Sequence, residues 1–583
     1  MMSQQLSALR AEMVREGVAA YLVPRADEHL GEYVPPAAER LAFLSGFTGS
    51  AGLAVVLADR ACLFTDGRYV TQAQHQLDPA CWERRHITEE PPATWLAQEL
   101  PGGIVGYDPM LMSEEALGRY TEAGLVAKPL ANLVDRIWSD RPPLPQAPAV
   151  VQSLELAGRS SAEKRAQIAA ALRSAGRDAA VLTDPASIAW LLNIRGTDVP
   201  FTPFALGFAV VHADERVTLF MDEAKLTPAV LAWLGNGVER RPRHALAQSL
   251  AELAGRRVQV DAAGSPAWFA QTLRAAGAAV VAGPDPCLLP KACKNDTEQA
   301  GARLAHRRDA VAVCRFLHWA ATQGIGHSEW EAAEHLLALR RGLEDFREES
   351  FPAISGAGEN AAIMHYRVAA PTARTLRAGE VYLIDSGAQF GCGTTDVTRT
   401  LWLGPDPAPA AIRDQATRVL RGHIAIATLV FPHGVGGAHI DALARRPLWE
   451  AGLDFDHGTG HGVGSYLSVH EGPVSISRLA RPVPIAEGMI LSDEPGYYLP
   501  GSHGIRLENL LLVQAAEGHG SRPFLRFETL TLAPFDRRLI DAAGLSEAER
   551  GWLDAYHARV LAEIGPALPA ASAAWLAEAC RPL

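Results

Sequence analysis

The sequence lacks long apolar runs and concentrated basic segments. No stretch of about 18 consecutive apolar residues occurs, so no membrane-spanning helix is expected. The N-terminal segment MMSQQLSALRAEMVREG is amphipathic and charged, without the apolar block of a signal peptide. No run of Lys and Arg stands out, and the formal net charge is −12, so nucleic acid is not an expected partner. We therefore expect a cytoplasmic protein with no membrane or nucleic-acid partner.

Cysteine is also scarce, with seven residues scattered over 583 positions and no CxxC pair. An odd number without paired spacing argues against a disulfide framework and for free thiols in a reducing compartment. Cys392 lies close to the motif described below, where we interpret it as a packing residue of a turn and not as a metal ligand.

The chain is too long for a single core, and its length suggests about three or four domains. In its first part the same order of elements is predicted twice: helix, strand, helix, glycine turn and two strands. This repetition indicates an internal duplication. Proline-rich segments at 142–148 and 284–290 mark two boundaries. The expected domains are therefore two related α/β domains at 1–150 and 151–290, and a third at 291–583 with an extension from about 523.

Four carboxylates and one imidazole stand out in the third domain, each in a short apolar or glycine-rich segment: Asp385, Asp396, His461, Glu494 and Glu508. Residues 381–384 and 394–400 read as strands of a hairpin that brings Asp385 and Asp396 side by side. Two close carboxylates repel each other, and a cation between them removes that penalty. Carboxylates can bridge two ions, so this ligand set suits a pair of divalent metals.

The two glutamates lie at predicted strand positions. Glu494 follows the apolar run 489–491 and precedes Pro495, at the point where a strand enters a turn. Residues 505–513 read as one strand, in which Arg506 and Glu508 alternate onto the same face and Arg506 pairs with a ligand carboxylate. Acidic residues at strand ends can also be ordinary turn residues, and this is the alternative for each position taken singly.

The segments IDSGAQF, GTTDVTRT, DHGTGHGVGSYLSVHEGP, LSDEPGYY and GIRLENL resemble the pita-bread metallopeptidase family. Within that family they are similar to aminopeptidase P, the Xaa-Pro aminopeptidases, in the long three-domain form. The resemblance implies two related, creatinase-like N-terminal α/β domains and a C-terminal catalytic pita-bread domain. It also implies that all five residues above are metal ligands.

The same resemblance implies removal of the N-terminal residue from peptides with proline in second position. A hydroxide bridging two divalent metal ions would attack the Xaa-Pro bond, and Glu494 would accept and deliver the proton. Ligand hardness favours manganese, with zinc and cobalt still open. A homodimer is the expected assembly.

Further residues gain roles from the resemblance. His365 and His470 would contact substrate and assist catalysis, and His457 would line the pocket for the residue after the cut. A buried histidine satisfied by the backbone is the alternative for His365 and for His470. Arg68 would contact substrate from the first domain, against the alternative of an ion pair with Asp66.

His457 and His461 could each be the ligand by spacing alone, and the family pattern places the ligand second. A zinc pair four residues apart on a helix would lack the glutamate of HExxH, and the glycines of this segment disfavour a helix. His306, in a helix expected to start near 295–297, is expected on the helix surface without a role.

Two other functions remain open. A prolidase would cut only Xaa-Pro dipeptides with the same ligands, but it has one N-terminal domain where this chain predicts two. A catalytically silent peptide-binding module on the same fold would lose the ligands, which are all present here.

Overall fold

The computed structural model describes residues 2–518 and 522–583 and separates them into two compact units. Unit 1 comprises Met1–Leu154 and Arg159–Leu288, and unit 2 comprises Glu155–Gly158 and Leu289–Leu583. The exact bounds expected for three domains stay a prediction.

Unit 1 contains two six-stranded sheets with one topology, in the orders β4-β3-β2-β1-β5-β6 and β12-β11-β10-β8-β13-β14. In the first sheet β1 pairs antiparallel with β2 and parallel with β5. In the second sheet β8 pairs in the same way, antiparallel with β10 and parallel with β13. The first sheet consists of β1 (Ala20–Pro24), β2 (Leu53–Leu57), β3 (Ala61–Thr65), β4 (Glu83–His86), β5 (Ile104–Tyr107) and β6 (Val126–Pro129). The second consists of β8 (Ala179–Leu182), β10 (Phe208–His212), β11 (Val217–Phe220), β12 (Val238–Arg241), β13 (Arg257–Val260) and β14 (Ala279–Ala282). This equivalence is what the internal duplication predicts.

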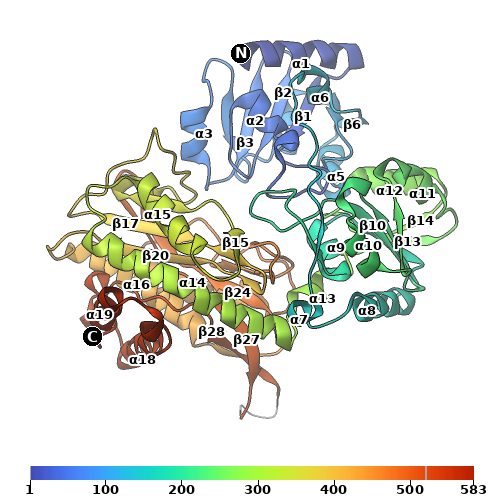
Figure 1. Ribbon diagram of the computed structural model, residues 1–583. Coiled ribbons are helices and arrows are strands. Elements are labelled where there is room, and N and C mark those ends of the chain that lie inside the picture. Colours follow the sequence, from blue (N-terminus) through green and yellow to red (C-terminus); the bar gives the residue numbers. More distant parts are fainter. Residues whose placement is uncertain (1, 519–521) are drawn as a thin grey trace. The chain divides into compact units, whose positions relative to one another are not determined.

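Helices connect and cover these strands (Figure 1). The helix before the second sheet, α8, begins after a capping box in which Ser160 and Glu163 satisfy each other's backbone N–H groups. Helix α9 is capped by Asp184 at its start and ends at Asn193, whose φ of 51° is left-handed. The main helices of unit 1 are α1 (Met2–Glu16), α2 (Arg40–Ser45), α3 (Val70–Gln76), α4 (Pro92–Glu99), α5 (Glu114–Glu122), α8 (Ser161–Ser174), α9 (Pro185–Leu192), α10 (Pro228–Leu234), α11 (Leu246–Ala251) and α12 (Ala267–Ala275).

Unit 2 is built from small antiparallel sheets, which place the predicted metal ligands. Three strands form the sheet β16 (Ile354–Ala357), β17 (Val381–Ser386) and β20 (Val397–Trp402). Four form the sheet β21 (Val430–Pro432), β28 (Phe524–Thr529), β27 (Asn509–Ala516) and β24 (Ile490–Asp493). Smaller sheets join β15 (Phe346–Glu349), β18 (Ala388–Phe390) and β19 (Gly393–Thr394), then β22 (Gly460–His461) and β23 (Ser475–Ile476), then β25 (Gly496–Leu499) and β26 (His503–Arg506).

Long helices pack on these strands with a common apolar core (Figure 1). Helix α14 begins after Asn295, as the sequence predicts, and Asn295 forms a capping box with Glu298. The long helices of unit 2 are α14 (Asp296–Thr322), α15 (Glu329–Arg341), α16 (Ala410–Ala427), α17 (Gly437–Trp449), α18 (Glu547–Ile564) and α19 (Ala570–Ala579). Side chains of α14, α16, α18 and α19 meet in one cluster with strand residues such as Val381 and Ile505, which joins the C-terminal extension to the rest of unit 2.

Three local predictions were wrong. Residues 505–513 do not form one strand, because β26 pairs with β25 whereas β27 pairs with β24 and β28, and Glu508 lies at the break. Residues 394–400 are likewise split, since β19 pairs with β18 and β20 pairs with β17. His306 is only 3% exposed, because it lies on the buried face of α14, where its Nδ1 donates to the carbonyl of Ala302 (2.7 Å).

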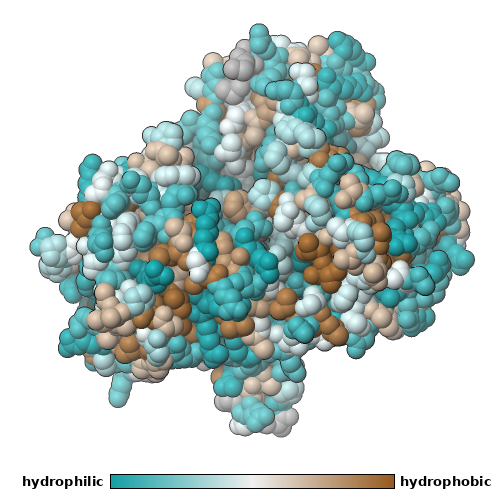
Figure 2. All heavy atoms as spheres, viewed as in Figure 1, coloured by the Kyte–Doolittle hydropathy of each residue, from teal (hydrophilic) through white to brown (hydrophobic). Residues whose placement is uncertain are grey.

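The surface shows no extended apolar band on the face drawn in Figure 2, where hydrophobic residues form small groups among hydrophilic ones. Among residues 2–518 and 522–583, no helix combines the length and apolar character needed to cross a bilayer. The seven cysteines are free thiols, and Cys392 is buried in a small cluster with Ala305 and Phe390, as expected for a packing residue.

Candidate metal centre

Asp385 and Asp396 enter the site from two paired strands. Asp385 lies in β17 opposite Thr398 of β20, and Asp396 immediately precedes β20. Both carboxylates are buried, with 7% and 3% of the residue exposed. The Oδ1 atom of each has no hydrogen-bond partner, which is costly for a buried carboxylate unless a cation satisfies it.

Glycines on both sides of His461 explain how a histidine reaches this site. A Cβ atom on Gly460 would lie 1.9 Å from the carbonyl oxygen of Ser492, and one on Gly462 would lie 2.2 Å from that of Glu471. Only glycine permits this close backbone packing, so the sequence GHG fixes β22 against its neighbours. His461 Nδ1 donates to the carbonyl of Gly462 (3.0 Å), so in a neutral imidazole Nε2 carries no proton and could bind a metal.

Hydroxyl groups orient the two glutamates. At the end of β24, Ser492 Oγ donates to Glu494 Oε1 (3.0 Å). Ser492 Oγ also accepts a hydrogen bond from the backbone N–H of His461 (2.9 Å). Thr398 Oγ1 donates to Glu508 Oε2 (2.6 Å). The N–H of Glu508 donates to the carbonyl of Thr398 (3.2 Å), so the break between β26 and β27 places Glu508 against β20.

These side chains converge on one buried space. Ligand atoms of Asp396, His461 and Glu508 all lie within 4.8 Å of one another. His461 Nε2 lies 3.5 Å from Asp396 Oδ2 and 3.4 Å from Glu494 Oε1. The structure therefore brings together residues that the sequence separates by more than a hundred positions.

The electrostatics are those of crowded carboxylates in low dielectric. Burial, and then repulsion by Asp396, Glu494 and Asp385, raises the pKa of Glu508 well above its usual range. Burial also raises the pKa of Glu494 and of Asp385, partly opposed by positively charged neighbours. Burial lowers the pKa of His461, but its hydrogen bond to Asp396 and the nearby charge of Glu494 outweigh that effect and raise it to about 9.

Arg506 is the positive charge within this wall. Its Nη2 donates to Asp385 Oδ2 (2.6 Å), as the sequence predicts for a pairing with a ligand carboxylate. Its Nη1 donates to the hydroxyl of Tyr498 (2.7 Å), and that hydroxyl lies 2.9 Å from His457 Nε2. A continuous chain of hydrogen bonds thus joins His457, through Tyr498 and Arg506, to Asp385.

The other predicted residues have different surroundings. The ring of His470 meets that of His461 edge-on, with centroids 4.3 Å apart. His365 is half-buried in an irregular loop, next to Met364, whose carbonyl lies 3.5 Å from Arg506 Nη1. Arg68 of unit 1 makes a two-pronged ion pair with Asp66 (2.7 and 2.9 Å). The catalytic and substrate-binding roles of these residues stay predictions.

Three residues of the site were missed in the sequence, namely Thr398, Ser492 and Tyr498. Thr398 could have been found, because it lies two residues after Asp396 in a strand, where alternation places both on one face. Ser492 has the same spacing to Glu494. Tyr498 gave no such signal, since its contact with His457 spans 41 residues.

The donor set fits divalent cations. Hard carboxylate oxygens with one imidazole nitrogen suit manganese, zinc or cobalt, and carboxylates with two oxygens can bridge two ions. Two unpartnered buried oxygens and raised carboxyl pKa values are the features that a bound cation would relieve. Asp385, Asp396, His461, Glu494 and Glu508 are the residues that could hold it.

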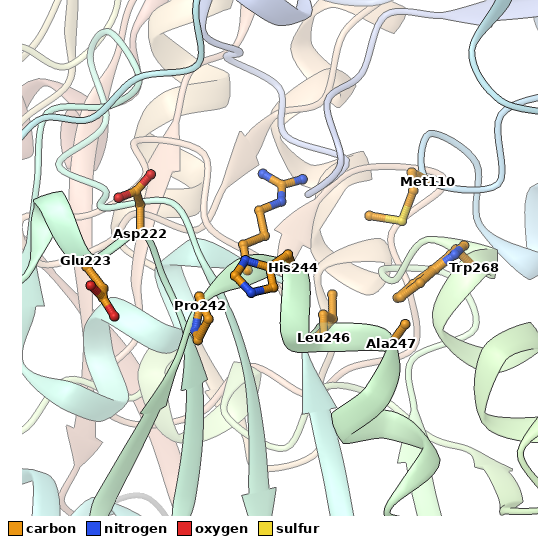
Figure 3. A pocket seen from close by; sticks show the side chains of 9 residues that line it. Met110, Asp222, Glu223, Pro242, His244, Leu246, Ala247 and Trp268 are labelled. Carbon is orange, nitrogen blue, oxygen red and sulfur yellow. The ribbon is translucent and has the colours of Figure 1, made fainter.

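A hollow in unit 1 is of another kind (Figure 3). Its volume is about 800 Å³, and it is lined by Met110, Asp222, Glu223, Pro242, Arg243, His244, Leu246, Ala247 and Trp268. The guanidinium of Arg243 pairs with Glu28 (3.1 Å) and lies 5.3 Å from the ring centre of Phe208. None of the residues predicted for the metal site lines this pocket.

Four family models match the chain. The model of metallopeptidase family M24 matches residues 300–515, and that of the C-terminal region of this peptidase family matches residues 523–583. Two models of the creatinase/prolidase N-terminal domain match residues 5–137 and 140–298.

Relatives match over nearly the full length. A protein of Sordaria macrospora called a probable Xaa-Pro aminopeptidase P is 39% identical over 95% of this chain and 94% of its own. Aminopeptidase P2 of Arabidopsis thaliana is 38% identical over 100% of this chain and 88% of its own. The crystal structure of an X-prolyl aminopeptidase from Caenorhabditis elegans, described as a cytosolic enzyme with a di-nuclear active site, superposes with a TM-score of 0.94 at 35% identity over 100% of both chains.

Proposed function

The chain belongs to the aminopeptidase P branch of metallopeptidase family M24, and we propose that it releases the N-terminal residue from peptides whose second residue is proline. The predicted resemblance and fold class, with two creatinase-like domains and a C-terminal peptidase domain, are confirmed. The observation that carries the proposal is that Asp396, His461 and Glu508 place ligand atoms within 4.8 Å of one another on this fold, with Glu494 3.4 Å from His461. Relatives of matching length are named for the same activity.

Two divalent ions are the cofactors that this cluster supports, in keeping with the di-nuclear site of the Caenorhabditis elegans enzyme. We propose Asp385, Asp396, His461, Glu494 and Glu508 as their ligands and manganese as the metal, because four hard carboxylates dominate the set. When bound, such ions lower the pKa of water and polarise a peptide carbonyl.

The protein's own residues would handle the protons. We assign general acid–base chemistry to Glu494, whose Oε1 is held by Ser492 Oγ and by the approach of His461 Nε2. A carboxyl group with a raised pKa can accept a proton from the nucleophile and return it to the leaving nitrogen. An amide nitrogen is a poor leaving group unless it is protonated, so the proline nitrogen must receive a proton as the bond breaks.

Substrate contacts complete the proposal. His470, whose ring meets that of His461, would donate to the scissile carbonyl oxygen. His365 would contact the substrate and assist proton transfer, and His457 would line the pocket for the residue after the cut. The hydrogen bond from Tyr498 to His457 Nε2 would hold that ring in place. We also propose Arg68 as a substrate contact.

One assay tests the activity. Metal-stripped protein is supplied with Mn²⁺ and offered Arg-Pro-Pro, Gly-Pro and Ala-Ala-Ala. We expect release of arginine from Arg-Pro-Pro and little cleavage of Ala-Ala-Ala. Turnover of the dipeptide alone would identify a prolidase, and no turnover with manganese, zinc or cobalt would favour a silent peptide-binding module.

Assembly and location complete the proposal. The homodimer stays a prediction, which light scattering of the purified protein would test. A cytosolic location is proposed from the description of the Caenorhabditis elegans enzyme and from the free thiols. Fractionation of the source cells would test it.

A further inference from the structure

The loop that carries His365 is long and mostly irregular. It leaves β16 at Ala357, forms a single 3-10 segment, η4 (Gly358–Ala362), and then continues without regular structure through His365 to Arg374. Such a loop can hold a side chain in place only if other contacts fix its backbone.

A single buried carboxylate, that of Glu329, makes those contacts. Glu329 is the first residue of α15 and is 0% exposed. Its Oε1 accepts from the N–H of Ala357 (2.7 Å) at the start of the loop, and its Oε2 accepts from the N–H of Arg374 (2.8 Å) at the end. Asn360 Nδ2 donates to both oxygens (3.1 and 3.0 Å), and the hydroxyl of Tyr366 donates to Oε2 (2.9 Å).

All of these groups donate hydrogen bonds to Glu329. They can be satisfied only by a side chain in which both terminal atoms are acceptors. An amide in place of the carboxylate would present its NH₂ to one of two backbone N–H groups, that of Ala357 or that of Arg374, whichever way it turned. The position therefore requires a carboxylate, although it lies outside the metal cluster and touches none of the five ligands proposed above.

The opposite side of the loop is fixed against the wall of the metal site. A Cβ atom on Gly504 of β26 would lie 1.8 Å from the carbonyl oxygen of Ala361 in η4, so the two backbones are in direct contact. Two residues along β26, Arg506 contacts the carbonyl of Met364 (3.5 Å) and pairs with Asp385. The loop is thus clamped between α15 and the strand that carries Arg506.

We propose that Glu329 is a positioning residue for substrate binding, which acts by holding the backbone on both sides of His365. Tyr366 is the link nearest to that histidine, since it is adjacent in sequence and its hydroxyl is bound to Glu329. The proposal rests on the proposed function, in which His365 contacts the peptide.

A double-mutant cycle tests the proposal. Glu329→Gln, His365→Ala and the double variant are assayed with Mn²⁺ on Arg-Pro-Pro. We expect Glu329→Gln to lower kcat/KM by about tenfold to hundredfold, the cost of an unsatisfied buried donor. In the His365→Ala background the same change should cost less than about twofold, because the two residues act as one unit. An equally large loss in that background would overturn the proposal.

Two further variants guard against misfolding and against a nonspecific effect. Tyr366→Phe removes one donor and leaves the others, and we expect a loss of about twofold to tenfold that also disappears without His365. Glu334→Gln is the matched control, since Glu334 is an exposed residue of the same helix, and it should leave kcat/KM unchanged.

Two readouts separate this proposal from the peptidase assignment. Calorimetric titration with Mn²⁺ should give the same affinity for Glu329→Gln as for the unaltered protein, and a parallel loss of metal affinity would refute a role confined to the loop. Amide hydrogen exchange should be faster in residues 357–374 of Glu329→Gln than of Glu334→Gln. If the unaltered protein cleaves no peptide, the peptidase proposal fails, and equal exchange in the two variants would then refute the positioning role as well.

Discussion

Replacing Thr398 by valine tests how the metal site is held together. Thr398 is fully buried, and its hydroxyl donates to Glu508 Oε2 (2.6 Å) while accepting from Arg506 Nε (3.2 Å). Valine has nearly the same shape, so the change removes these two hydrogen bonds without opening a cavity. Glu508 then loses the bond that fixes its orientation.

The size of the effect follows from that contact. A hydrogen bond to a charged group contributes about 1.5–3 kcal/mol, and each 1.4 kcal/mol or so is tenfold in an equilibrium constant. We therefore expect Thr398→Val to weaken Mn²⁺ binding by about tenfold to hundredfold, the range typical of groups that orient a metal ligand. Calorimetric titration of the metal-stripped protein measures this directly.

Thr322→Val is the control for this experiment. Thr322 is exposed at the end of α14, and its hydroxyl donates to the carbonyl of His318 (2.7 Å), so valine removes one hydroxyl hydrogen bond away from the metal cluster. Both variants should keep their melting temperature within a few degrees. Unchanged Mn²⁺ affinity in folded Thr398→Val would show that the hydroxyl does not hold Glu508 in a binding geometry.

Three more outcomes follow from the same site and its support. Glu508→Ala should abolish turnover and weaken Mn²⁺ binding, whereas retained activity would remove Glu508 from the ligand set. In metal-free protein the pKa of His461 is raised to about 9, above its unfolded value of about 6.5, so its stabilising effect is complete below pH 6.5 and is lost as the pH rises through 9. Since only the neutral ring binds metal, Mn²⁺ binding at pH 7.5 should release protons, which calorimetry in buffers of different ionisation enthalpy detects. Glu471 lies between Lys294 (2.5 Å) and Lys291 (3.3 Å), all of them buried, so Glu471→Gln should lower the free energy of unfolding by about 3–5 kcal/mol in urea titrations.

Local patterns made the five proposed ligands visible in the sequence. His461 lies between two glycines, which the close packing of the neighbouring backbone requires. Glu494 follows a short apolar strand and precedes Pro495. The repeated succession of elements predicted the two sheets of unit 1, whose strand orders are equivalent. Such signals are short in range, because turn chemistry and strand alternation depend on immediate neighbours.

Predictions failed where the pairing of strands changes along one run of residues. The sequence at 505–513 is uniformly strand-like, yet it contributes to two sheets, and Glu508 is placed by its backbone contact with Thr398. His306 read as a surface residue because a polar side chain at that position can face either way. It is buried because that face of α14 packs on other elements of unit 2, among them β19, and the sequence does not show which face is covered.

The amino-acid sequence by itself determined the chemistry of this protein, since its motifs specify which acids and which imidazole are gathered. The tertiary structure alone decided what holds the cluster and the loop beside it, because Thr398 meets Glu508 across 110 residues and Glu329 meets Arg374 of the His365 loop across 45. The five proposed ligands lie beside turns and strand ends, which can be recognised from a few neighbouring residues in the sequence. The residues that support them come from distant parts of the chain, and they come into contact only when the folded chain packs these parts together.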